Sequence, residues 1–137
     1  MRKLIESTHV TLGGEIGSPH EWGFPYLDDE HFAYASSLLS DADALLLGRR
    51  TYEGLSAGYT SMAGDAPGGS IVKYGNGPLD VTLMEHNLID EFHLLLTPVA
   101  VGRGQHMFAD LDGSPQLTLA EVTRFSNGVL VLVDVPT

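Results

Sequence analysis

The chain has 137 residues, the length of one ordinary domain and enough to bury an apolar core. Eighteen acidic and seven basic side chains give a formal charge of −11, which repels phosphate backbones and argues against a nucleic-acid partner. The chain has no cysteine, and no run of residues approaches the ~20 apolar residues of a membrane span. We therefore expect a single domain over residues 1–137 that lies in the cytoplasm and has no membrane partner.

The N-terminal third predicts a strand, a loop and a helix. Lys3–Val10 contains β-branched residues and predicts the strand, whereas Gly17–Glu30 carries three aromatics among glycines and prolines and predicts a loop. Asp28 or Asp29 is suited to cap the helix that follows. That helix is expected to end near Ser40-Asp41 and to bury the helically spaced positions Phe32, Ala35, Leu38 and Leu39.

The next stretch begins with a short apolar run. Ala44–Leu47 predicts a strand of a parallel sheet that is buried on both faces, and Gly48 is expected to end it. A short helix is expected around Thr51–Leu55. Ser56–Ser70 is rich in small residues, glycine and proline without periodicity, and predicts a loop.

The same order of elements then recurs. Ile71–Tyr74 predicts a strand, the glycine-containing turn Gly75-Asn76-Gly77 follows it, and Pro78 is suited to the first position of a helix. Asn87 is suited to the left-handed residue that ends this helix. The side chains expected to face inward from it are Leu79, Leu83 and Met84.

The C-terminal third predicts three further strands. Glu91–Gly102 is the first, with Pro98 restricting its far end. Gln116–Val135 contains two β-rich runs around Asn127-Gly128, the dipeptide that most readily forms a type I′ hairpin turn.

Two junctions from strand to helix, at Gly48 and at Gly75-Asn76-Gly77, are places where anions can bind. Glycine allows a ligand close to the backbone, and the first N–H groups of a helix point at that ligand. The alternative is that these glycines only turn the chain. Neither junction matches the dinucleotide fingerprint GxGxxG.

Arg49 and Arg50 strengthen the first junction, because guanidinium groups offer paired donors to phosphate oxygens, including a ribose 2′-phosphate. Alternatively, one of these arginines pairs with a nearby carboxylate, Asp41 or Asp43. The six histidines show no compact metal-binding spacing, so no metal is expected.

Several stretches resemble one known family. They are ALLLGRRTYEGL, IVKYGNGPLDVTLMEH, NLIDEFHLLLTPVAVGRGQHMF, the hairpin VTRFSNGVLVLV and the opening STHVTLGGEIGSPHEWGFPYLDDEHF. Together they resemble the dihydrofolate reductase-like family that includes the C-terminal reductase domain of bacterial riboflavin biosynthesis. The family's run of spaced Asp-Glu, Leu, Pro, Gly-x-Gly and Phe is matched by Asp90, Glu91, Leu94, Pro98, Gly102, Gly104 and Phe108.

This resemblance implies a three-layer α/β/α fold with a mixed, mostly parallel sheet and a C-terminal β-hairpin. It also implies NADPH as the cofactor and hydride transfer to a pteridine-, flavin- or pyrimidine-like heterocycle. The cofactor-binding residues it implies are Gly48, Arg49, Arg50, Thr51, Gly75, Asn76, Gly77, Pro78 and Leu79. It places Trp22, Phe24 and Tyr26 toward the substrate, where the alternative is that they pack the loop.

The resemblance also brings Asp28 toward the substrate as the catalytic carboxylate. The alternative is that Asp28 only caps the helix, and the residues themselves leave open which of Asp28, Asp29 and Glu30 faces the pocket. In the first loop, Thr11-Leu12-Gly13-Gly14 lacks the aspartate that the family commonly has.

The sequence is also shorter than the family pattern between Tyr52 and Ile71, by about one strand-helix-strand unit, which takes roughly 30 residues. This shortening leaves open a second function, a catalytically silent binding or oligomerising module of the same fold. A shortened sheet exposes an edge that a partner chain can cover, so a homodimer is expected.

Overall fold

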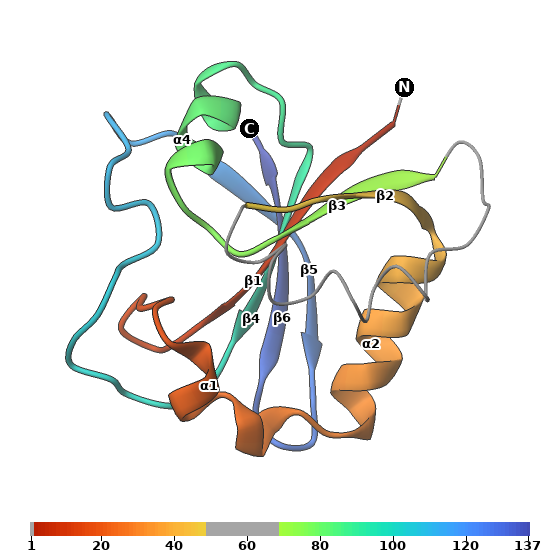
Figure 1. The fold of residues 1–137 in the computed structure, drawn as a ribbon, viewed down its shortest axis with the longest axis vertical. Coiled ribbons are helices and arrows are strands. Elements are labelled where there is room, and N and C mark those ends of the chain that lie inside the picture. Colours follow the sequence, from red (N-terminus) through yellow and green to blue (C-terminus); the bar gives the residue numbers. More distant parts are fainter. Residues whose placement is uncertain (1, 49–68) are drawn as a thin grey trace.

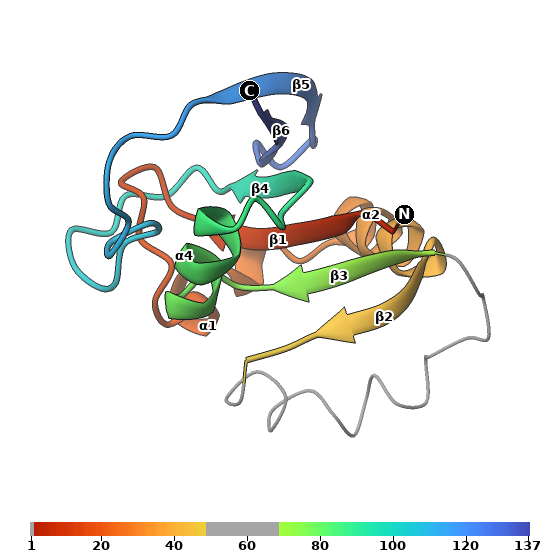
Figure 2. The same ribbon diagram turned by 90° about the horizontal axis from the view of Figure 1, so that it is seen from above.

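The computed structural model describes residues 2–48 and 69–137, which form one mixed six-stranded sheet with the strand order β2-β3-β1-β4-β6-β5 (Figures 1 and 2). The strands are β1 (Leu4–Val10), β2 (Ala42–Leu46), β3 (Ser70–Tyr74), β4 (Glu91–Leu96), β5 (Leu117–Arg124) and β6 (Leu130–Pro136). The strands β2, β3, β1 and β4 run parallel, and β6 and β5 complete the sheet as antiparallel neighbours. The expected mixed α/β fold with a C-terminal hairpin is therefore confirmed.

Four helical segments accompany the sheet in the described part of the chain. They are α1 (Pro19–Trp22), the 3₁₀ turn η1 (Phe24–Tyr26), α2 (Asp29–Ser40) and α4 (Pro78–Glu85). The sequence predicted a loop where α1 and η1 lie. The predicted helix Thr51–Leu55 falls outside the described residues, as does the predicted loop Ser56–Ser70 except for its last two residues.

The two longer helices cover opposite faces of the sheet (Figure 1). Successive side chains of a strand point to opposite faces, and Ile5 of β1 is paired with Val72 of β3. Both pack against Leu38 of α2. The next pair along, Glu6 and Lys73, therefore points the other way, where Lys73 contacts Asp80 of α4. The sheet is thus the middle layer between α2 and α4.

The helix α2 begins where its capping residue predicts. Asp28 has extended backbone angles, and its side chain accepts a hydrogen bond from the backbone N–H of His31. Leu38 is buried as expected, but Phe32 is 56% exposed, which corrects the prediction that it faces the core. In that turn of α2, Tyr34 is the side chain that reaches the core, where it packs against the cluster that contains Leu95 and Phe125.

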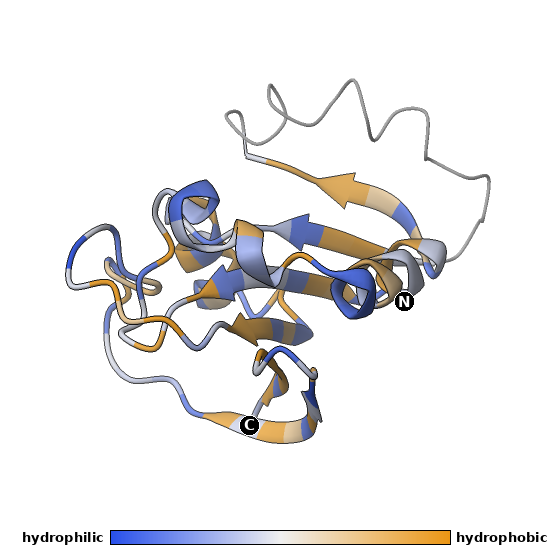
Figure 3. Ribbon diagram, turned by 90° about the horizontal axis from the view of Figure 1, so that it is seen from below, coloured by the Kyte–Doolittle hydropathy of each residue, from blue (hydrophilic) through white to orange (hydrophobic). Residues whose placement is uncertain are grey.

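The predicted strand Ala44–Leu47 is present as β2, two residues earlier at its start. Its position in the sheet differs from the prediction, because β2 pairs with β3 alone in the described part of the chain. Its residues are accordingly only half-buried. Figure 3 shows apolar residues, in orange, on both outer strands of this sheet, β2 and β5.

The helix α4 begins at Pro78 as predicted, and Asn87 follows it with a positive φ of 54°. Its inward face differs from the expected one. Leu79 is 40% exposed, whereas Asp80 is buried. The reason is a contact at the helix start, where the Asp80 carboxylate turns back and accepts a hydrogen bond from the backbone N–H of Gly77.

The C-terminal hairpin forms between β5 and β6, but its turn is not of type I′. That type needs a positive φ at both central residues, and within the turn only Gly128 has one, at 94°. The backbone N–H of Gly128 donates to Phe125 O, and that of Phe125 donates to Val129 O, as in a three-residue loop with a bulge at glycine. Asn127 instead uses its side chain, which donates to Tyr26 O and to Asp28 Oδ2.

Within the described residues, no helix is long and apolar enough to cross a membrane.

Candidate functional site

A cavity of about 550 Å³ lies between α2 and the sheet. Its walls come from β1, from the end of β3, from α2 and from the loops beside them. The lining residues are Ser7, Thr8, His9, Ile16, Pro19, His31, Tyr34, Ala35, Tyr74, Gly75, Asn76, Leu95 and Gln105. The strand residues among them lie in the carboxyl halves of parallel strands, where open α/β sheets bind ligands.

Among the described residues, the cavity lining contains polar side chains but no Asp, Glu, Lys or Arg. His9 and His31 face each other across it, with ring centroids 5.1 Å apart and ring planes inclined by 44°. Burial, together with the neighbouring His31, lowers the pKa of His9 to about 4. Burial also lowers the pKa of His31, although the charge of Asp28 opposes that shift. At neutral pH the described part of the lining is therefore uncharged and suits a neutral ring that needs hydrogen bonds.

Tyr34 joins the cavity to a chain of hydrogen-bonded side chains. Its hydroxyl oxygen lies 3.0 Å from Nδ1 of His93, and Nε2 of His93 lies 2.8 Å from Oε2 of Glu91. The other oxygen of Glu91 accepts a hydrogen bond of 2.8 Å from Nζ of Lys3. Burial raises the pKa of Tyr34 to about 12, so its hydroxyl keeps the proton at neutral pH.

Glu91 holds the outer end of this chain as an anion. Partial burial acts to raise its pKa, but hydrogen bonds from Lys3 and His93 outweigh burial, and the net shift is downward. A charged Glu91 accepts from the Nε2–H of His93 and thereby orients the imidazole ring.

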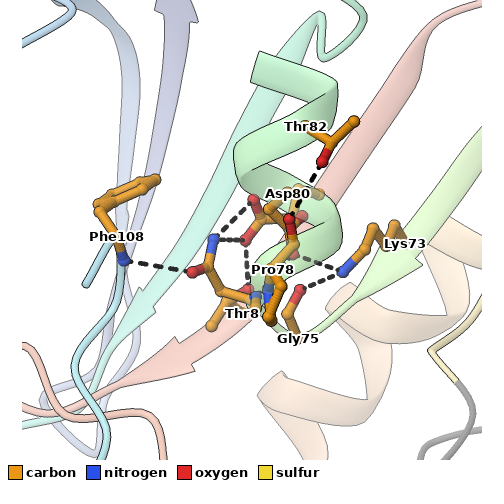
Figure 4. A network of polar contacts seen from close by, with 10 residues as sticks. Thr8, Lys73, Gly75, Pro78, Asp80, Thr82 and Phe108 are labelled. Atoms are coloured by element: carbon orange, nitrogen blue, oxygen red, sulfur yellow. Dashed lines mark hydrogen bonds and ion pairs between the residues drawn. The ribbon is translucent and has the colours of Figure 1, made fainter. Parts of the chain in front are cut away.

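The opposite face of the sheet carries a second polar network (Figure 4). The Lys73 ammonium lies 2.7 Å from Asp80 Oδ2 and 2.8 Å from the carbonyl oxygen of Gly75. The same Asp80 oxygen accepts from the backbone N–H of Gly77 at 2.7 Å. The side chains of Lys73 and Asp80 are 5% and 1% exposed, so this ion pair is screened little by solvent. It ties the turn between β3 and α4 to the sheet.

Glu6 and Asn76 extend this network. Asn76 Nδ2 donates to both Glu6 carboxyl oxygens, at 3.3 and 3.2 Å, and Asn76 Oδ1 accepts from the backbone N–H of Phe108. Burial, and next the negative charge of Asp80, raise the pKa of Glu6 to about 8. Glu6 is therefore mainly protonated at neutral pH, which leaves one carboxylate opposite the Lys73 cation.

The turn 75–77 is predicted to bind the cofactor, and part of this turn lines the cavity. Gly75 and Asn76 line it, whereas Gly77, Pro78 and Leu79 do not. Gly75 has a positive φ of 81°, which favours glycine, and a Cβ added at Gly75 or at Gly77 would meet no atom within 4 Å. The turn thus exposes its backbone to open space. A Cβ added at Gly48, after β2, would also meet nothing.

The three aromatics predicted near the substrate do not line the cavity. Trp22 is buried, and its indole N–H donates to the carbonyl oxygen of Gly17 at 3.0 Å. Phe24 is 65% exposed, and Tyr26 packs against the core cluster around Leu95. Trp22 thus holds the segment that carries it, and Tyr26 contacts the core of the sheet; their predicted contact with the substrate stays a prediction.

Asp28, predicted as the catalytic carboxylate, has both oxygens engaged. Oδ1 accepts from the backbone N–H of His31 at 3.1 Å, and Oδ2 accepts from Asn127 Nδ2 at 3.0 Å. Glu30 binds the backbone N–H and the hydroxyl of Ser126, while Asp29 is exposed. Asp28 and Glu30 thus attach the start of α2 to the hairpin, and none of the three carboxylates lines the cavity.

The predicted phosphate-binding residues Arg49, Arg50 and Thr51 lie outside the described residues.

Sequence reasoning missed the residues that line most of the cavity, although a signal for them exists. Ser7 and His9 lie two residues apart on β1, so their side chains are on the same face of the sheet. On α2, Tyr34 and Ala35 follow His31 at intervals of three and four residues and therefore share one helix face. Only the fold brings these two faces together.

Comparison with known proteins places the chain beside riboflavin-biosynthesis reductases. The model of the RibD C-terminal domain family matches residues 61–131. The uncharacterized protein YyaP of Bacillus subtilis is 36% identical over 67 residues, a match that covers 49% of this chain and only 36% of that protein.

Solved structures share the fold at low sequence identity. RibD of Acinetobacter baumannii superposes with a TM-score of 0.74 at 10% identity, over 100% of this chain and 58% of that one. A putative riboflavin biosynthesis protein from Shewanella sp. PV-4 gives 0.69 at 16% identity, over 98% and 99% of the two chains. Schistosoma mansoni dihydrofolate reductase gives 0.62 at 12% identity, over 99% and 100%.

Proposed function

Because the chain belongs to the RibD C-terminal domain family, we propose that it is a reductase that uses NADPH to reduce a pteridine-, flavin- or pyrimidine-like heterocycle. The bound cofactor would supply the hydride, and the protein would bind, orient and desolvate the reacting ring. One solved neighbour, from Thermotoga maritima, is named as a deaminase and 5-amino-6-(5-phosphoribosylamino)uracil reductase, and this chain covers 57% of it.

The observation that carries this proposal is the cavity between α2 and the sheet. Its volume of about 550 Å³ lies within the range of small-molecule sites, roughly 300–1,000 Å³. The described lining residues supply imidazole, hydroxyl and amide groups that can hydrogen-bond the edge of a neutral heterocycle. The apolar side chains Ile16, Ala35 and Leu95 provide contacts for the faces of such a ring.

The described residues fit the cofactor at the turn after β3. Gly75 and Asn76 line the cavity, and the open space beside Gly75 and Gly77 allows a ligand to approach the backbone. The N–H of Gly77 already binds Asp80, so a phosphate would have to use other donors. We propose that Arg49, Arg50 and Thr51, which follow Gly48 at the end of β2, supply them, with Pro78 and Leu79 bordering the same site.

The first experiment is a titration with NADPH and separately with NADH. The fluorescence of Trp22, the single tryptophan, reports binding, and calorimetry detects binding that leaves the fluorescence unchanged. We expect tighter binding of NADPH. A charged hydrogen bond contributes about 1.5–3 kcal/mol, so the double variant Arg49→Ala/Arg50→Ala should bind NADPH about ten- to hundredfold more weakly.

The matched control is Arg124→Ala, which removes an exposed positive charge from β5. It should leave the NADPH affinity within twofold of the wild type. Equal affinity for NADPH and NADH, or equal losses in the control and the double variant, would contradict the proposed cofactor site.

A second candidate, the oligomerising module, is favoured by one observation. The strand β5 is exposed over nearly its whole length, and Leu119 and Val122 are 52% and 50% exposed. The bulge between Leu119 and Glu121 places those two apolar residues on the same face, opposite Asp134 and Leu132 of β6. We propose that this face forms a homodimer. Light scattering should give twice the monomer mass, and Leu119→Lys/Val122→Lys should give the monomer mass.

A further inference from the structure

We propose that Tyr34 donates the proton in the reduction, and that His93 and Glu91 are positioning residues that hold and replenish it. The proposal rests on the proposed reductase function. It assigns to this cavity a proton donor other than the Asp28 carboxylate expected from the sequence.

The sheet register places the members of this chain side by side. Ser7 of β1 is paired directly with His93 of β4, so both side chains lie on the face that α2 covers. Tyr34 of α2 lies over that pair, with its ring centroid 6.2 Å from that of His93. Its hydroxyl reaches His93 Nδ1 at 3.0 Å, while the ring also lines the cavity.

The hydrogen-bonded chain runs from the protein surface to the cavity. The Lys3 side chain is 63% exposed, and the side chains of Glu91 and His93 are 18% and 12% exposed. Each step between them is 2.8 Å long. Solvent can therefore exchange a proton with the outer members, while Tyr34 at the inner end lines the cavity.

Carboxyl groups and imidazoles at the cavity are less suited as donors. The described lining residues include no carboxyl group, and both oxygens of Asp28 accept hydrogen bonds elsewhere. His9 and His31 are neutral at neutral pH, because burial lowers the pKa of each. Tyr34 remains protonated and can donate.

The proton step balances as follows. A C=N bond of the substrate gains the nicotinamide hydride at carbon, and its nitrogen takes the hydroxyl proton of Tyr34. The Tyr34 oxygen then regains a proton from water, relayed through the ring nitrogens of His93, while Glu91 keeps its hydrogen bond to Nε2 of that ring. One hydride and one proton have been added to the substrate, and no charge remains on Tyr34.

Charged and polar groups from three elements surround His93. Glu91 lies on its own strand, Lys3 on β1 balances one oxygen of Glu91, and Tyr34 approaches from α2. Asp90 lies beyond them and accepts from the backbone N–H of Leu4.

The test uses Tyr34→Phe, His93→Gln and Glu91→Gln, with His86→Gln as the control. His86 is exposed at the end of α4 and bonds only Thr82 O among the described contacts. Single-turnover oxidation of NADPH is followed with 5-amino-6-(5-phosphoribosylamino)uracil and 7,8-dihydrofolate as probes. NADPH affinity is measured in parallel.

General acid catalysis contributes about 10²–10⁴-fold, so Tyr34→Phe should slow reduction by that factor and abolish the solvent isotope effect. Its NADPH affinity should stay within twofold. His93→Gln and Glu91→Gln should slow reduction and lower the solvent isotope effect, and Glu91→Asp should restore both in part. A merely structural role would not change the isotope effect.

Nitrogen-15 spectra of the imidazoles give a readout that needs no substrate. Tyr34→Phe should shift the Nδ1 resonance of His93, and His86→Gln should not. An unshifted resonance, or a Tyr34→Phe variant that reduces the probes at the wild-type rate, overturns the proposal. Wild-type protein that binds no NADPH, or oxidises it with none of the probes, overturns the reductase function and the catalytic role together.

Discussion

Asp28 shows how one residue supports two interpretations that only a matched pair of variants separates. Asparagine caps helices as well as aspartate does, and its side-chain oxygen can accept the hydrogen bond that Asp28 accepts from the His31 backbone. A capping Asp28 therefore predicts that Asp28→Asn retains most of the stability and most of the reductase activity. Asp28→Ala should lower the free energy of unfolding by about 0.5–2 kcal/mol. Urea denaturation and NADPH oxidation measure both quantities.

If Asp28 were the catalytic carboxylate, Asp28→Asn would instead fold normally and lose nearly all activity. The contacts of Asp28 to the helix backbone and to Asn127 favour the capping role.

Gly128 is the residue whose backbone decides the shape of the hairpin turn. Its φ of 94° is unfavourable for other residues, and an added Cβ would lie 3.2 Å from Pro98 Cγ. Gly128→Ala should therefore lower the free energy of unfolding by roughly 1–3 kcal/mol, the cost of a residue in a sparsely populated backbone region. The control is Gly102→Ala, because a Cβ added at Gly102 meets nothing within 4 Å. This variant should change the free energy of unfolding by less than about 0.5 kcal/mol. Equal changes in thermal unfolding would argue against this account.

At the scale of elements, the buried network joins β1, β3 and α4 and makes stability depend on pH. The pKa of Glu6 in the folded protein is about 8, above its ordinary value of 4.5, so folding retains a proton that the unfolded chain releases. This stabilisation is fully present below pH 4.5 and is lost as the pH rises through 8. His9 acts oppositely, because its pKa of about 4 lies below 6.5, and its destabilising effect is confined to pH values below 6.5.

Between pH 6.5 and 8, Glu6 is therefore expected to contribute most to the change of stability with pH. The free energy of unfolding should fall there by up to about 1.4 kcal/mol per pH unit. The Glu6→Gln variant lacks this titrating proton, so its free energy of unfolding should change clearly less with pH. Glu85→Gln, at the exposed end of α4, should keep the wild-type slope. Urea denaturation at several pH values provides the measurement, and parallel slopes in the wild type and Glu6→Gln would exclude this role.

The element boundaries were predictable because local signals set them. Asp28 and Pro78 begin their helices, and Asn87 follows α4 in the left-handed conformation. The turn at Asn127-Gly128 was placed correctly but given the wrong geometry, because the Asn127 side chain binds Tyr26 and Asp28, about 100 residues away. Sequence patterns carry no signal for such distant contacts.

At the scale of the molecule, the position of each strand in the sheet decides which side chains meet. The exposure of β2 could not be predicted, because an apolar run reads the same in an outer strand and in a central one. The cavity was missed for a related reason: Ser7, Tyr34 and Tyr74 come from three separate elements. The turn at Gly75 was found because its glycines are a local signal.

The central claim is that this cavity and the turn after β3 together bind NADPH. The most direct measurement is a titration of isotope-labelled protein with NADPH, followed by amide and imidazole NMR resonances. We predict saturable shifts at Gly75 and Asn76 of the turn and at His9 and His31 of the cavity, at lower concentrations of NADPH than of NADH. Shifts absent from these residues at saturating NADPH, or confined to residues remote from the cavity, would contradict the claim.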